Sequence, residues 1–252
     1  MFKKILLKSV LLSLISLTTF VLPVLAGGLP TYSELKKALT DVVKEGNGGF
    51  GLNMWATIVN RDGVVKAVLF SGDNRGEQWP GSRVISAQKA NTANAFSLPG
   101  LALSTANLFY AVQPGGSLYG LQHSNPVDTK VAYQGLSKKI GTKNDPMVGC
   151  KIGGVNVFGG GLPLYTSTGR LIGAIGVSGD SSCADHNIAW KVRYKLNLDY
   201  VPAGVSPTSD DNIINDMVDK ISKSGWGHPA CSPDAAEIAG KLPETHPISS
   251  NK

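Results

Sequence analysis

The segment Gly159–Arg193, GGGLPLYTSTGRLIGAIGVSGDSSCADHNIAWKVR, decides the fold of this chain. It begins with three glycines and continues as two apolar runs separated by a Thr168-Gly169 turn, and it ends in a helical pattern. Apolar runs joined by a short glycine turn are typical of an antiparallel hairpin. Ser182–Asp185 fits the S-x-x-[DE] capping box and predicts where the helix begins. The segment therefore predicts a hairpin followed directly by a capped helix.

A second hairpin is predicted upstream. The runs Met54–Arg61 and Val64–Ser71 are separated only by Asp-Gly, a dipeptide that favours two-residue hairpin turns. Apolar spacing predicts a helix over Thr31–Glu45, and an alanine-rich pattern predicts another over Ser82–Ser97. This order of elements predicts an α+β fold with two layers, in which helices pack on one face of an antiparallel sheet.

The first hairpin is apolar on both faces. With Arg61 opposite Val64, the first face carries Trp55, Thr57, Val59, Val68 and Phe70, and the second carries Met54, Ala56, Ile58, Val65, Ala67 and Leu69. Because a solvent-exposed face of an antiparallel sheet is normally polar, two apolar faces indicate that both faces of this hairpin are covered. Helices can cover one of them, and the other needs a ligand, a second subunit or the loop-rich segment 117–158. We therefore expect a homo-oligomer with this hairpin or the alanine-rich helix in its interface.

The N-terminus has the features of a secretory signal peptide. A basic start is followed by the apolar run Val10–Leu25 and by Ala26, a small residue at the predicted cleavage site. We expect a signal peptide over residues 1–26, one domain over 27–200 and a C-terminal extension over 201–252. Cleavage near Ala26 would leave the protein periplasmic or secreted. No later run is long and apolar enough to span a bilayer.

The charge balance excludes nucleic acid as an expected partner. The chain has 24 Lys and Arg against 18 Asp and Glu, a net charge of +6. Removal of the three lysines of the predicted signal peptide lowers this charge to +3. Nucleic-acid binding needs a basic stripe, and the remaining sequence has none.

Three cysteines, Cys150, Cys183 and Cys231, would enter an oxidising compartment. An odd number indicates one disulfide and one free thiol. Cys183 lies at a helix entrance, and Cys231 lies in a loop-like tail that otherwise lacks an anchor. We therefore predict a Cys183–Cys231 bond, with Cys150 left free.

His186 and Trp190 are candidate cofactor-binding residues on one stripe of the predicted helix. In the first helical turn, the helix N-terminus disfavours an imidazolium and keeps His186 neutral. A neutral imidazole suits haem iron or another metal, which makes His186 the candidate iron ligand; an ordinary surface position is the alternative. On the predicted strand Leu171–Ser178, small residues such as Gly176 permit the close approach of either a helix or a flat ligand.

Lys89 and Asp185 are the candidate catalytic residues. Lys89 could act as a base only if burial lowers its pKa. The structural alternative for Asp185 is the capping role given above.

In its ordered motifs the chain resembles the GlcG/HbpS haem-binding, or haem-degrading-domain, family. The resemblance extends from about Thr31 to Arg193. It rests on four motifs followed by Asp185: Val59–Gly63, Ser86–Phe96, Gly159–Pro163 and Gly173–Gly179. It implies a profilin-like two-layer sandwich, oligomeric assembly and the binding of haem or a related tetrapyrrole. It also implies that Lys89 and Gly160, which lie in these motifs, help to bind the cofactor.

The chain departs from the family pattern in three places: the insertion Gly72–Gly81, the long segment 117–158 and the cysteine-bearing tail after Arg193. The function that the resemblance implies is an exported haem-binding protein, non-enzymatic or only slowly haem-degrading. The alternatives are a small-molecule enzyme of the same fold that uses Lys89 and Asp185, and an extracytoplasmic sensor or accessory subunit.

Overall fold

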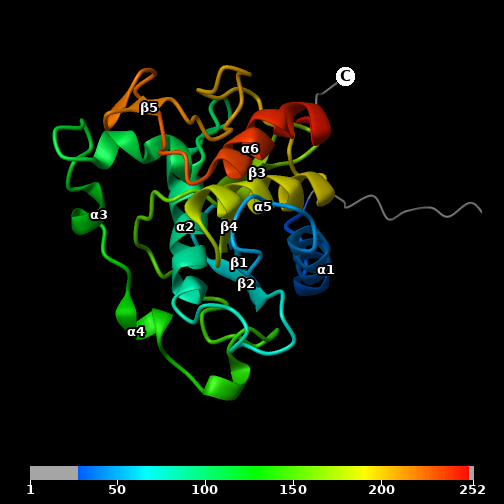
Figure 1. The fold of residues 1–252 in the computed structure, drawn as a ribbon. Coiled ribbons are helices and arrows are strands. Elements are labelled where there is room, and N and C mark those ends of the chain that lie inside the picture. Colours follow the sequence, from blue (N-terminus) through cyan, green and yellow to red (C-terminus); the bar gives the residue numbers. More distant parts are fainter. Residues whose placement is uncertain (1–27, 250–252) are drawn as a thin grey trace, which may run out of the picture.

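The computed structural model describes residues 28–249, which contain a four-stranded antiparallel sheet of order β2-β1-β4-β3 (Figure 1). Strands β1 (Trp55–Asn60) and β2 (Val65–Phe70) form the first predicted hairpin, and β3 (Gly161–Tyr165) and β4 (Leu171–Ser178) form the second. The two hairpins join through antiparallel pairing of β1 with β4. The predicted α+β class with an antiparallel sheet is confirmed. The predicted signal peptide, residues 1–26, lies outside the described residues.

Helices cover the sheet. Helices α1 (Tyr32–Val43) and α5 (Ser182–Lys195) share an apolar core with one face, which gives the helical layer that was predicted. Helix α2 (Ser82–Phe96) adds a layer on the opposite face, where its alanines pack against β1, β2 and β4. A third layer is possible because the facing side chains of α2 and β4 are small.

The first hairpin has the predicted register at one end only. Trp55 lies opposite Phe70 and Ile58 opposite Ala67, but a bulge follows Ile58 and brings Val59 opposite Val65. Because a shift of one residue moves a side chain to the other face, Val65 joins the core cluster of Trp55. Its predicted placement with Met54 on the opposite face was wrong.

Both apolar faces of this hairpin are covered within one chain. Besides α2, residues of segment 117–158, including Met147 and Ile152, pack on the face of Trp55. The uncovered face that motivated a homo-oligomer is therefore absent, and the oligomeric state stays a prediction.

Local capping sets the helix boundaries. Helix α1 begins after Thr31, which forms a reciprocal capping box with Glu34. Helix α5 is capped by Ser181, whose side chain accepts the N–H of Ala184. The predicted Ser182–Asp185 capping box was wrong by one residue, and the carboxylate of Asp185 is free for another role.

The C-terminal extension contains the short strands β5 (Met217–Val218) and β6 (Ile221–Ser222) and helix α6 (Pro233–Thr245). Helix α6 lies against α5 (Figure 1). The Cys183–Cys231 disulfide is present, as predicted, and Cys150 is free. The expectation that little else holds the tail was wrong, because Arg193 and Asp211 form a fully buried ion pair between α5 and the extension.

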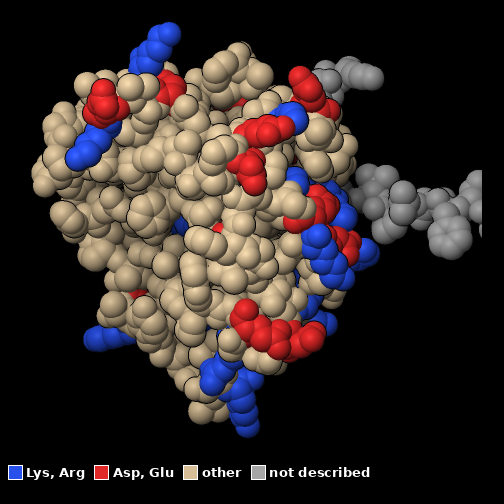
Figure 2. All heavy atoms as spheres, viewed as in Figure 1, with Lys and Arg blue, Asp and Glu red and all other residues tan. Residues whose placement is uncertain are grey.

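Segment 117–158 is mostly irregular, with two four-residue helices, α3 (Leu121–Ser124) and α4 (Thr129–Ala132). It forms an arc of chain beside α2 (Figure 1). On the face drawn in Figure 2, acidic and basic side chains are interspersed around the rim and form no basic stripe. Within residues 28–249, no helix is long and apolar enough to cross a membrane.

Candidate functional site

A buried ion pair joins the two residues predicted as catalytic. Lys89 Nζ lies 2.6 Å from Asp185 Oδ2 and also donates to the carbonyl oxygen of Val177. The side chains are only 1% and 3% exposed, although their helices, α2 and α5, cover opposite faces of the sheet. Burial lowers the pKa of Lys89 and raises the pKa of Asp185 to about 6, while the attraction between the two charges opposes both shifts. The ion pair links α2 to α5 in the interior of the protein, where a substrate cannot contact it.

Two of the predicted cofactor-binding glycines make room for this packing. A Cβ on Gly160 would lie 3.0 Å from Asp185 Cβ and 3.3 Å from Lys89 Nζ. A Cβ on Gly176 would meet backbone atoms of Ser86 and Ala90 in α2. Of the two interpretations of these small residues, close helix packing is the one present, and α2 occupies the space over Gly176 that a flat ligand would need.

His186, the predicted iron ligand, is fully buried. Its Nε2 accepts the N–H of Ile213 at 3.1 Å and lies 3.1 Å from Asn212 Oδ1, while Nδ1 has no hydrogen-bond partner among the described residues. Burial lowers the pKa of His186 to about 3, so the ring is neutral as predicted, but burial is the main cause rather than the helix N-terminus. Because Asn212 and Ile213 cover the imidazole, haem could reach it only if the extension moved.

Trp190, the other predicted cofactor-binding residue, anchors the extension. Its side chain is buried, and its Nε1 donates to the carbonyl oxygen of His246 at 2.9 Å. The guanidinium of Arg193 stacks 4.9 Å from the centre of its ring. Trp190 therefore links α5 to the end of α6.

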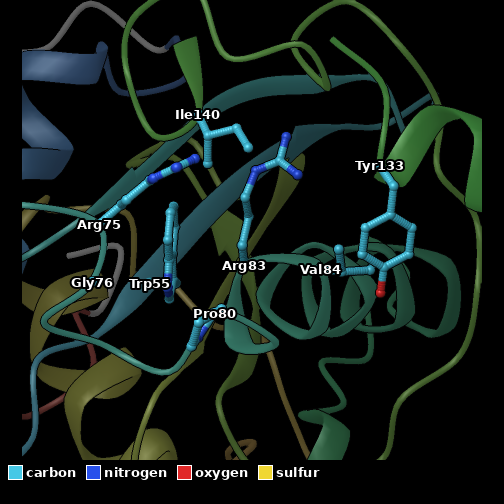
Figure 3. Close-up of a pocket in the computed structure, with 8 residues that line it drawn as sticks. All are labelled: Trp55, Arg75, Gly76, Pro80, Arg83, Val84, Tyr133 and Ile140. Carbon is cyan, nitrogen blue, oxygen red and sulfur yellow. The ribbon is translucent and has the colours of Figure 1, made fainter. Parts of the chain in front are cut away.

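A cavity of about 400 Å³ lies elsewhere, at the N-terminal end of α2 (Figure 3). Its lining comes from β1, the turn before α2, α2 itself and segment 117–158, and consists of Trp55, Arg75, Gly76, Pro80, Arg83, Val84, Tyr133 and Ile140. Its volume is within the range of small-molecule sites, roughly 300–1,000 Å³. The lining combines apolar surface with two guanidinium groups and contains no carboxylate.

The two arginines of the cavity have different roles. Arg83 binds Asp145 through two parallel hydrogen bonds and donates to the carbonyl oxygen of Ala132, which fixes the loop of Tyr133 and Ile140 against α2. Its charge is compensated by Asp145. Arg75 is exposed and donates to the carbonyl oxygen of Ser137. Arg75 is therefore the group that gives the cavity its positive charge.

Trp55 supplies an unpaired donor at this cavity. The residue is 1% exposed, and its Nε1 has no hydrogen-bond partner among the described residues. A buried N–H without a partner is rare and costly.

Sequence reasoning missed this cavity, although a signal was present. Arg75, Gly76 and Pro80 lie in the insertion Gly72–Gly81, and Tyr133 and Ile140 lie in segment 117–158. Both segments depart from the family pattern, and the fold brings them together around Trp55.

A second cavity, of about 640 Å³, opens between the segment after α2 and the extension. Phe109 and Tyr110 line one side, and Met217, Ile221 and Pro229 line the other. The extension supplies four of its ten lining residues.

Comparison with known proteins gives one family match. The family model described as haem degrading protein HbpS-like matches residues 31–193, which is more than half of the chain. No curated protein matches.

Similar solved structures include a PduOC–haem complex, with 25% identity and a TM-score of 0.47 over 68% of this chain and 96% of that one. Another is protein ORFY of Klebsiella pneumoniae, with 24% identity and a TM-score of 0.44 over 65% and 85% of the two chains. A double mutant of Streptomyces reticuli HbpS has 18% identity and a TM-score of 0.42 over 66% and 85%. With TM-scores this low, family membership rests on the sequence match.

Proposed function

We propose that this chain, which belongs to the HbpS-like family of haem-degrading proteins, is an exported haem-binding protein. The observation that carries the proposal is the family match over residues 31–193. The basic and apolar pattern of residues 1–26 supports export, with cleavage near Ala26 and a periplasmic or secreted mature protein. The protein is non-enzymatic or only slowly haem-degrading.

We place the haem at the cavity of Trp55. Haem is a flat apolar ring with two propionates, and the cavity offers apolar surface together with the exposed guanidinium of Arg75, a donor for a carboxylate. Among the lining residues, Tyr133 carries a phenol, a known type of axial ligand for haem iron. Bound haem would supply an iron centre able to take a small ligand, and Tyr133 would hold that iron.

The cavity of Trp55 fits haem binding better than the larger cavity or His186 does. Trp55, Arg83 and Val84 of its lining lie in the family-matched region outside the two departing segments, whereas the larger cavity depends on Met217, Ile221 and Pro229 of the extension. His186 is covered by the extension and has no exposed surface. The enzyme alternative is not favoured, because Lys89 and Asp185 are buried against each other.

Haemin titration of variants tests whether haem binds in the cavity of Trp55. Charge reversal in Arg75→Glu should weaken haemin binding by about tenfold, which corresponds to about 1.4 kcal/mol, and Tyr133→Phe should shift the Soret maximum of the bound haem. Lys223→Glu and Tyr119→Phe are matched controls, because both side chains are exposed and outside the cavity. His186→Gln should leave the Soret band unchanged.

Unchanged haemin binding by the cavity variants would refute the proposed binding site. If Arg75→Glu and Tyr133→Phe bind haemin like the wild type, the haem lies elsewhere. Loss of binding in Met217→Leu would then assign it to the larger cavity, and loss in His186→Gln would assign it to α5.

Assembly is a separate part of the proposal. The family resemblance favours a homo-oligomer, and a partner role as an extracytoplasmic sensor subunit remains the alternative function. Light scattering of the haem-free and haem-loaded protein measures the assembly directly. A mass equal to that of one mature chain in both states would contradict the proposed homo-oligomer.

A further inference from the structure

Two cysteines and a histidine meet at the N-terminal end of α5. The Sγ atoms of Cys183 and Cys231 and a ring nitrogen of His228 all lie within 4.8 Å of one another. Cys183 Sγ is 4.0 Å from His228 Nδ1. Two thiolates and an imidazole are donors that Zn²⁺ prefers. In this structure the two sulfurs are joined as a disulfide.

Backbone N–H groups surround the two sulfurs. The backbone N–H of Cys183 donates to Cys231 Sγ at 3.1 Å, and the N–H of Cys231 donates to Cys183 Sγ at 3.1 Å. Cys183 also lies in the first turn of α5, a helix of 14 residues. Backbone N–H groups and the positive end of a helix dipole are favourable partners for a negatively charged sulfur.

Both ring nitrogens of His228 are hydrogen-bonded. Its Nδ1 donates to the carbonyl oxygen of Pro229 at 2.8 Å, and its Nε2 accepts from Ser182 Oγ at 2.8 Å. The hydroxyl is itself held by the N–H of Gly159 at 2.7 Å. Metal binding at Nδ1 would break the hydrogen bond to Pro229, and the ring proton would then reside on Nε2 and be donated to Ser182. Such a partner fixes the orientation of a ligating imidazole.

We propose that reduction of the Cys183–Cys231 disulfide creates a site for a thiophilic divalent cation of the Zn²⁺ class. A dithiol gives two electrons and two protons to the disulfide and itself becomes a disulfide, which leaves two thiols. Metal binding releases both thiol protons, and the ligands are the two sulfurs and His228 Nδ1. The sulfurs must separate so that each lies about 2.3 Å from the metal, and Cys231 is the exposed one of the two cysteines.

This site goes beyond haem binding. Cys231 and His228 lie outside residues 31–193, the family-matched region, so the extension supplies two of the three ligands. Three protein ligands would leave one position of a tetrahedral ion for water. The extension would then be held by a disulfide under oxidising conditions and by a metal under reducing conditions.

Metal titration of the reduced and oxidised protein tests the proposal. The purified chain is reduced with a phosphine, its thiols are counted with Ellman's reagent, and Co²⁺ is added before Zn²⁺. The reduced protein should show a thiolate-to-cobalt charge-transfer band that Zn²⁺ removes, and the oxidised protein should show none. His228→Gln should weaken Zn²⁺ binding by about tenfold or more. Cys150→Ser, which changes only the free thiol, should bind like the wild type.

The controls make each result decisive. His228→Gln keeps both cysteines, so the far-UV circular dichroism of its oxidised form reports whether it folds before reduction. A reduced wild-type protein with three titrated thiols and no charge-transfer band would overturn the proposal, as would equal Zn²⁺ binding by the oxidised protein. Wild-type affinity in folded His228→Gln would also overturn it, because the imidazole would not be a ligand.

Discussion

Replacement of Lys89 by methionine should destabilise the protein severely. Lys89 and Asp185 are almost fully buried and are the closest charged partners of each other, at 2.6 Å. Loss of the ammonium leaves the carboxylate of Asp185 in the interior, where the N–H of Asp180 is its one remaining donor among residues 28–249. Removal of one partner of a buried ion pair costs about 3–5 kcal/mol. This is a large part of the roughly 5–15 kcal/mol that stabilises a typical domain.

The assay is urea unfolding followed by tryptophan fluorescence, arranged as a double-mutant cycle. Lys89→Met and Asp185→Leu should each be strongly destabilising, whereas the double variant should recover most of the loss, because an apolar pair needs no partner. Lys241→Met is the matched control: it removes an exposed lysine paired with Glu237 and should leave the unfolding midpoint almost unchanged.

Acid should relieve the defect of Lys89→Met. Burial raises the pKa of Asp185 in the folded protein, so the folded form binds this proton more tightly than the unfolded form does, and stability is gained as the pH falls through the folded pKa. The reasoning is refuted if Lys89→Met unfolds at the wild-type urea concentration, or if the double variant is as unstable as the sum of the single ones. If the double variant is folded and still binds haemin, the pair is structural.

Three further predictions concern packing and titration. His186→Gln should flatten the acid side of the stability profile: the neutral wild-type imidazole, with a folded pKa of about 3, loses stability as the pH falls below its unfolded pKa. Between neutral pH and about pH 4.5 the wild type should lose about 2–3 kcal/mol more than the variant, measured by urea unfolding. Gly176→Ala should cost about 1–3 kcal/mol through overpacking against α2, whereas Gly240→Ala, whose Cβ would meet nothing within 4 Å, should not lower the melting temperature. Cys231→Ser should cost about 2–4 kcal/mol, and Cys150→Ser should unfold like the wild type; a thermal shift in both would contradict the assigned bond.

The hairpins were predictable because local chemistry specifies them. Gly63 and Gly169 both have φ of +73°, a conformation that favours glycine in tight turns. The apolar alternation on either side then fixed most of the register. The disulfide was also predictable, since three cysteines allow few pairings, although the stated reason, an unanchored tail, was wrong.

The environment of the candidate residues was not predictable from sequence patterns. Lys89 and Asp185 are separated by 96 positions, and only the packing of α2 and α5 on opposite faces of one sheet makes them a pair. The first turn of α5 would be an exposed place for His186 without the extension. Periodicity gave no sign that Asn212 and Ile213 cover the ring, since irregular segments have no repeating pattern.

The cavity was missed for a similar reason. Trp55, Arg75 and Tyr133 come from a strand and two loops far apart in the chain, and each has an ordinary local context. The two insertions relative to the family pattern were the available signal, because long irregular segments in a compact domain are often functional.

Haemin titration of the purified wild-type protein, followed by absorbance, tests the central claim most directly. Haem binding predicts a shifted Soret band that saturates at a fixed stoichiometry. It also predicts quenching of tryptophan fluorescence, because Trp55 lines the proposed seat. A spectrum that remains that of free haemin at stoichiometric concentrations would contradict the claim.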